Sequence, residues 1–186
     1  MKDMERSLSR TEWREAATGG LYAGLAYALL TIAAHAGRSM PGLVTILNAV
    51  SFFSFAGFLY FYARRMAAYA GGDGFSYGRS LLFVLKMSLF AGVLAGVGQN
   101  VLVNWIDPEG FREQFDLMVA NMAGGGMGEK EAEMAGSLGL KLMRNPLFAV
   151  FSGIFSMLIY GGLLGLLISI FVRRPADPFG GGTSAE

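Results

Sequence analysis

The sequence predicts an all-α polytopic membrane protein: a four-helix transmembrane bundle with a helical hairpin in the outer loop between spans three and four. Four apolar runs predict the bundle, at about residues 16–36, 43–63, 80–103 and 146–172, and none of them contains Asp or Glu. Each run reaches the roughly 20 residues that a helix needs to cross a bilayer core. A chain that is 53% hydrophobic and 16% charged is also more apolar than ordinary soluble domains.

Residues 1–15 are expected to form a cytoplasmic N-terminal segment before the first span. Ser9 and Glu12 have the spacing of a capping box, and Trp13 is placed to anchor the helix at the headgroup level. A basic flank and an A-x-A pattern at residues 34–36 also fit a cleaved signal peptide. The acids within residues 1–15 and the length of the apolar run favour a retained helix instead.

The distribution of positive charge predicts the orientation, because Lys and Arg in short connections favour the cytoplasmic side. The third connection holds seven acids against four cations, whereas the N-terminal segment, the second connection and the tail are basic. Both termini are therefore expected in the cytoplasm, with residues 175–186 as a disordered tail. The expected location is the bacterial inner (cytoplasmic) membrane. The basic positions are Lys2, Arg6, Arg10, Arg14, Arg64, Arg65, Arg79, Arg173 and Arg174.

The third connection, about residues 104–145, predicts a periplasmic helical insertion. Asp107-Pro108 and Asn145-Pro146 each combine an N-cap residue with proline at the first helical position. Glycines at 124–126 divide two amphipathic helices, whose apolar stripes must bury against the end of the bundle, the lipid interface or a partner protein. We expect the first stripe to face the membrane or the bundle. The stripes are Phe111, Phe115, Met118, Val119 and Met122, then Met134, Ala135, Leu138 and Leu142.

Lys86 is the charge that falls inside a predicted span. Because the apolar runs hold no carboxylate, we expect it to snorkel to the headgroups or to contact an anionic lipid. The alternative is an anion or substrate site. His35, at the outer end of span one, is expected to be interfacial or bonded to a backbone carbonyl, without a role in proton transfer.

Two polar stripes complete the candidate intramembrane site. Span two carries Asn48 and Ser51, with Ser54 nearby, and span four repeats Ser152, Ser156 and Tyr160 every four residues. Such groups usually form hydrogen bonds between helices or to the carbonyl four residues earlier, and this reading is favoured over an aqueous path.

Glycine pairs one turn apart occur on three of the four spans. Such pairs allow close approach of helix backbones in lipid. Packing within one four-helix unit is favoured over self-association, although a homo-oligomer through these faces stays open. The pairs are Gly20 and Gly24, Gly92 and Gly96, and Gly161 and Gly165.

Three motifs together resemble a known family. They are Phe75-Ser-Tyr-Gly78 before the span that contains Lys86, Trp105-Ile-Asp-Pro108 before an amphipathic helix, and Asn145-Pro146 before a Gly/Ser-rich last span that ends at Arg173-Arg174. The pattern is similar to the bacterial four-span membrane proteins grouped as domain of unknown function 4199. The resemblance implies four spans, a helical insertion between spans three and four, and an inner-membrane location. It implies no activity, cofactor or catalytic residue.

From the sequence we predict a non-enzymatic scaffold or accessory subunit of a membrane assembly. No hydrolase, metalloprotease or phosphate-loop motif is present, and the chain has no Cys. We therefore predict no catalytic residue, cofactor or metal site, and the scattered basic residues predict no nucleic-acid binding. The expected contacts are the lipid bilayer and another membrane protein through the outer hairpin. The alternative is a small transporter or channel that uses Lys86 and the serine stripes.

Overall fold

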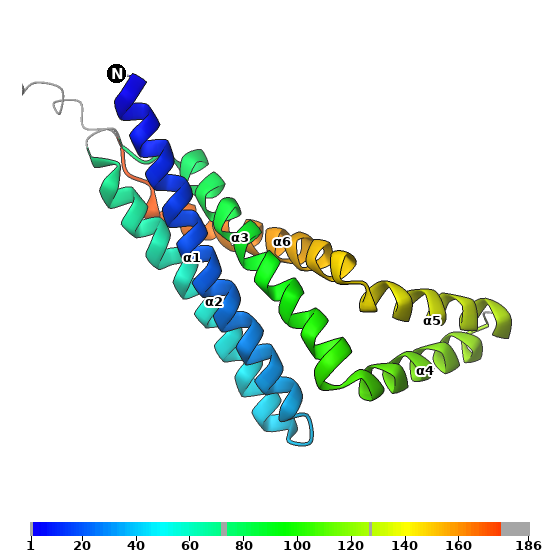
Figure 1. Cartoon of the computed structure of the whole chain (residues 1–186). Helices are drawn as coiled ribbons and strands as arrows, with labels where there is room; N and C mark the ends of the chain where they lie inside the picture. The colour runs from blue at the N-terminus through cyan, green and yellow to red at the C-terminus, as the bar shows by residue number, and fades with distance from the viewer. Residues whose placement is uncertain (1, 72–73, 127, 176–186) are drawn as a thin grey trace, which may run out of the picture.

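The structure, a computed structural model, describes residues 2–71, 74–126 and 128–175. Within these ranges the chain is helical, and Figure 1 shows the helices in order. The predicted disordered tail falls almost entirely outside the described residues. The helices are α1 (Lys2–Ala36), α2 (Pro41–Tyr69), α3 (Tyr77–Val101), which continues into a π-helical turn (Leu102–Ile106), α4 (Pro108–Gly124), α5 (Glu129–Arg144) and α6 (Pro146–Val172).

Four stretches of helix are long and apolar enough to cross a membrane: Ser9–Ala36, Pro41–Tyr69, Tyr77–Ile106 and Pro146–Val172. The α4–α5 pair lies between the third and the fourth. The predicted fold class is therefore confirmed. Large side chains on α2 and α6 point outward, as expected for a surface in contact with acyl chains; Phe53 and Phe151 are each 70% exposed.

α3 is the central helix of the bundle, because it packs on both α1 and α6, while α2 packs mainly on α1. The buried residues of α2 all lie between Ser51 and Ala67, and none lies in its first ten residues. The bundle is consequently closed at the end that holds Glu12 and Arg174, here named the termini end. It is looser at the end that holds Ala36 and Pro41, here named the hairpin end.

Glycines allow α3 to approach α1 and α6 closely. A Cβ atom on Gly24 of α1 would lie 2.6 Å from the carbonyl oxygen of Ala91, and one on Gly96 of α3 would lie 2.5 Å from that of Ala149. The other four predicted positions, Gly20, Gly92, Gly161 and Gly165, also face a neighbouring helix of the same chain. These glycine faces are therefore occupied by packing within one chain. This arrangement gives no support to an oligomer formed through them.

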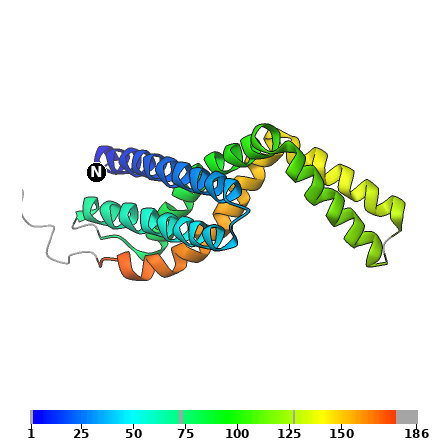
Figure 2. The ribbon, with the colours of Figure 1, turned by 90° about the horizontal axis from the view of Figure 1, so that it is seen from below.

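The hairpin formed by α4 and α5 extends sideways from the bundle, across the direction of α1 and α2 (Figures 1 and 2). Its two helices pack on each other through small residues of α5: Ala132 is fully buried, and Gly139 faces the ring of Phe115. The expectation that the first stripe faces the membrane or the bundle is confirmed for Phe111, which stacks on His35 of α1, and is wrong for Phe115, which packs on α5. Small residues on α5 form a closer contact surface for that ring than the end of the bundle, from which the hairpin points away.

Candidate functional sites: a lateral pocket and two charged clusters

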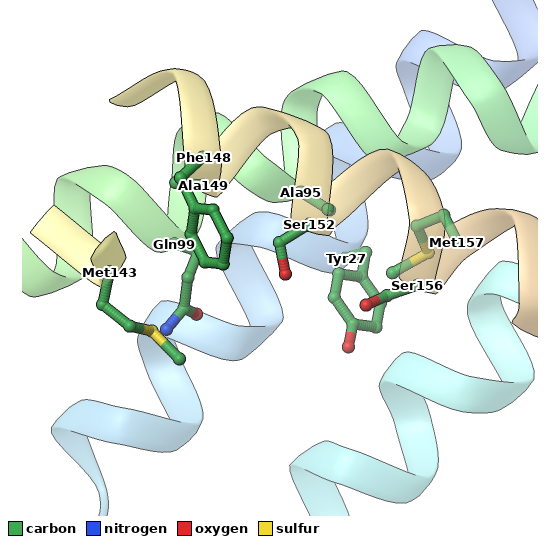
Figure 3. Close-up of a pocket in the computed structure, with 10 residues that line it drawn as sticks. Tyr27, Ala95, Gln99, Met143, Phe148, Ala149, Ser152, Ser156 and Met157 are labelled. Carbon is green, nitrogen blue, oxygen red and sulfur yellow. The ribbon is translucent and has the colours of Figure 1, made fainter. Parts of the chain in front are cut away.

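A pocket of about 190 Å³, here named the lateral pocket, lies at the hairpin end, where α1, α3 and the junction of α5 with α6 meet. Figure 3 shows the side chains of Tyr27, Gln99, Ser152 and Ser156 around one space. The remaining walls are apolar or small, and they come from Ala95, Met143, Phe148, Ala149, Gly153 and Met157. The pocket carries no charged residue in its lining.

The serine hydroxyls of this pocket differ from two other hydroxyls of the bundle, which donate to backbone carbonyls. Ser88 donates to the carbonyl of Val84 at 2.8 Å, and Thr31 donates to that of Tyr27 at 2.9 Å. Among the described residues, no such bond is found for Ser152 or Ser156, and both are exposed. An unpaired hydroxyl is costly in a hydrocarbon environment, so each group needs a partner: the carbonyl four residues earlier, water, or a polar ligand in the pocket.

A second, more open hollow of about 610 Å³ adjoins the first, because Gln99 lines both. It lies between α1, α2, α3 and α4, and its lining includes Thr31, His35, Arg38 and Gln114. The two hollows thus lie next to each other along α1, one beside Tyr27 and the other beside Thr31, His35 and Arg38.

The structure does not bring the whole predicted polar site together. Ser152 and Ser156 share a pocket, but Lys86 is not part of its lining. Tyr160 is 51% exposed and packs edge-on to Phe52, with 6.5 Å between the ring centroids. On α2, Asn48 is exposed, whereas Ser51 is buried and its hydroxyl finds no hydrogen-bond partner among the described residues.

Lys86 instead belongs to a charged cluster near the termini end. Its Nζ atom donates to Oε1 of Glu12 at 2.6 Å and lies 4.8 Å from the ring centroid of Trp13. Oε2 of Glu12 lies 3.5 Å from Nε of Arg79, and Glu12 is 7% exposed. The expectation that Lys86 lacks a carboxylate partner is therefore wrong.

The error arose from where the first helix begins. α1 starts at Lys2, so Ser9 is an interior residue and not an N-cap, and Glu12 belongs to the helix. Glu12, Glu15, Gly19 and Ala23 recur at helical spacing and are all buried, which places them on one face. Glu15 extends the cluster to α2, because its Oε1 lies 3.4 Å from Nη2 of Arg65. The spacing of Glu12 and Glu15 with Gly19 and Ala23 is the sequence signal that could have placed both acids on the buried face of the first helix.

A second charged cluster joins the bundle to the hairpin. Nε2 of His35 lies 2.7 Å from Oδ2 of Asp107, and Arg38 donates to the same carboxylate oxygen. The ring of His35 also stacks on Phe111, with 5.4 Å between the centroids. His35 is therefore bonded to a carboxylate and not to a backbone carbonyl, because the turn after α3 brings Asp107 back to the end of α1.

The motifs noted in the sequence form the joints between helices. Phe75 is fully buried and exchanges two backbone hydrogen bonds of 2.9 Å with Arg174, and Ser76 caps α3 by accepting from the amide of Arg79. Asp107 caps α4 by accepting from the amide of Gly110 at 3.1 Å. Asn145 caps α6 by accepting from the amide of Leu147 at 2.9 Å. The caps predicted at Asp107 and Asn145 are thus confirmed.

Four candidate spans, a compact helical bundle and a helical insertion before the last span define the protein as a multi-pass membrane protein. The chain belongs to the family described as protein of unknown function (DUF4199), whose model matches residues 18–174. This match confirms the family resemblance seen in the sequence. No curated protein and no solved structure matches the chain.

Proposed function

We propose that the protein is a non-enzymatic accessory or scaffold subunit of a membrane assembly, with the α4–α5 hairpin as the arm that contacts its partner. The observation that carries this proposal is the position of the hairpin. It extends beyond the bundle, and its root is fixed by the contacts of Asp107 with His35 and Arg38. Side-chain amides of Asn100 and Asn104 also donate to the carbonyl of Arg144. A fixed arm keeps its binding surface ordered before association, which lowers the entropic cost of binding.

The surface of α4 that faces away from α5 is the proposed contact. Glu109, Glu113 and Leu117 are exposed there, and Leu117 is 65% exposed. Asp116 is also exposed, but it lines the hollow between α4 and α5. In the proposed orientation both termini lie in the cytoplasm, in line with the basic residues near the termini end. The acidic surface then faces the periplasmic side of a bacterial inner membrane.

Site-specific photo-crosslinking in native membranes tests this proposal. A photoreactive amino acid at Glu113 or Leu117 should give discrete protein adducts of higher mass. The matched control is the same probe at Phe151, which is exposed on the apolar surface of α6 and should crosslink to lipid. Absence of protein adducts from both α4 positions would contradict the accessory-subunit proposal.

A small transporter or channel is the second candidate, and the unpaired hydroxyls of Ser152 and Ser156 favour it. The position of Lys86 does not favour it, because the ammonium group of Lys86 is engaged by Glu12. This candidate requires water or a polar solute to enter the lateral pocket from the hairpin end. Access of water-soluble reagents to Ser156 separates it from the scaffold proposal.

A further inference from the structure

One face of α5, here named the free face, is exposed and is not covered by any other described part of the chain. The opposite face packs on α4: Ala132 is fully buried, and a Cβ atom on Gly139 would lie 2.8 Å from the ring of Phe115. On the free face, Met134 is 65% exposed and Leu138 is 52% exposed. These apolar side chains therefore need a covering partner that the bundle does not supply.

The position of α5 indicates which side this free face meets. The hairpin runs across the direction of α1 and α2, and α5 lies nearer the termini end than α4 does (Figure 1). Since α4 is on the far side, the face of α5 opposite to α4 is turned back toward the level of the membrane-spanning helices. The acidic surface of α4 is turned the other way.

The chemistry of the free face matches a lipid interface. Lys130, Met134, Leu138 and Lys141 follow one another at i, i+4, i+8 and i+11, so they share one side of the helix. A helix that combines an apolar row with adjacent lysines lies in the plane of the interface, where the lysine stems reach lipid phosphates. Lys130 and Lys141 are exposed, as this arrangement requires.

Apolar side chains are also exposed where α5 joins the bundle. Leu142 is 42% exposed at the end of α5, and Leu147 and Phe151 at the beginning of α6 are each 70% exposed. Trp105, beside the root of the hairpin, is 81% exposed, and indole rings are enriched at membrane interfaces. Exposed apolar side chains are thus present on both sides of the junction between α5 and α6.

We propose that α5 lies on the lipid leaflet at the hairpin end, with Met134 and Leu138 among the acyl chains and Lys130 and Lys141 on anionic lipid phosphates. This contact holds the hairpin parallel to the membrane and presents the acidic surface of α4 to water. The inference stands independently of the proposed accessory function, which concerns the opposite surface of the hairpin.

Spin labelling in vesicles tests the inference, and the absence of native Cys makes each introduced thiol unique. The protein is reconstituted in vesicles of phosphatidylcholine and phosphatidylglycerol, with a spin label at Leu138→Cys or, as the matched control, at Glu113→Cys. Collisions with oxygen, which concentrates in lipid, should be favoured at position 138. Collisions with a water-soluble nickel chelate should be severalfold more frequent at position 113. Equal chelate access at the two positions in folded, monodisperse protein would overturn the proposal.

The lysines are tested separately, because their replacement leaves the apolar row intact. In Lys130→Gln/Lys141→Gln, chelate access to the label at position 138 should increase in vesicles that contain phosphatidylglycerol. In vesicles of phosphatidylcholine alone, the substitution should have little effect. If chelate access to the label at position 138 were unchanged in both kinds of vesicle, the proposed contact of Lys130 and Lys141 with anionic phosphates would be wrong.

Discussion

The Nζ atom of Lys86 lies 2.6 Å from Oε1 of Glu12, and this contact joins the central helix of the bundle to the first helix. Glu12 is almost fully buried and is also contacted by Arg79. When the cation is removed, the buried carboxylate still bears the cost of its desolvation. Replacing Lys86 therefore lowers stability mainly because a buried carboxylate with one fewer cation remains, and less because the attraction between the two charges is lost.

Lys86→Met should therefore destabilise the bundle, by about 1–3 kcal/mol for a buried charge left with fewer partners. Thermal unfolding of the purified protein in mild detergent measures the change. The matched control is Lys130→Met, since Lys130 is exposed on α5. Glu12→Gln should recover part of the loss when combined with Lys86→Met. Equal stability of the two single lysine variants would show that the Glu12 contact contributes nothing to the fold.

Much of the fold could be predicted because its signals are local. Apolar length marked the four spans, and the Asp-Pro and Asn-Pro pairs marked where α4 and α6 begin. Helix α1 was the exception, since it starts before its apolar run does. Apolar length alone therefore places Glu12 before the first span, and it does not reveal the carboxylate that α1 supplies to Lys86.

The direction and internal packing of the hairpin could not be read from the sequence. Hydrophobic stripes identify which face of a helix is apolar, but not whether that face meets protein or lipid. On α5 the protein contact uses Ala132, Gly136 and Gly139, while Met134 and Leu138 remain exposed. Likewise, spacing alone could not show that Ser152 and Ser156 share a pocket with Tyr27 and Gln99, which come from two other helices.

Gly24→Ala should disturb the contact between α1 and α3. The added methyl group would meet the carbonyl oxygen of Ala91, which is backbone and cannot rotate away. Overpacking of this kind costs about 1–3 kcal/mol. Gly57→Ala is the matched control, because a Cβ atom there meets nothing within 4 Å. Thermal unfolding should separate the variants, and equal midpoints would contradict the close packing.

Asp107→Ala should loosen the root of the hairpin. The substitution removes the N-cap of α4 and the shared acceptor of His35 and Arg38. Pulsed electron spin resonance between labels at Thr45→Cys and Leu117→Cys should give a broader distance distribution than the same pair with Asp107 intact. Asp116→Ala, at an exposed position of α4, should leave the distribution unchanged. An unbroadened distribution in Asp107→Ala would mean that other contacts fix the hairpin.

The proposed orientation is tested by reporter fusions. Fusions after Ala70 and Glu186 should report the cytoplasm, because both follow basic segments, and one within Gly124–Gly126 should report the opposite side. A cytoplasmic signal from the glycine turn would reverse the orientation and place the acidic surface of α4 in the cytoplasm.

Water access to the lateral pocket distinguishes the two functional candidates. Phe155 and Ser156 are consecutive on α6, yet Phe155 is 68% exposed on the apolar surface, whereas Ser156 lines the pocket. The pocket volume of about 190 Å³ accommodates several waters, each of which occupies about 30 Å³ in the liquid. If water fills it, a membrane-impermeant thiol reagent added at the hairpin end should modify Ser156→Cys but not Phe155→Cys. A lack of reaction at Ser156→Cys, in protein that reacts fully after denaturation, would mean that lipid chains fill the pocket. The channel or transporter candidate would then lose the observation that favours it.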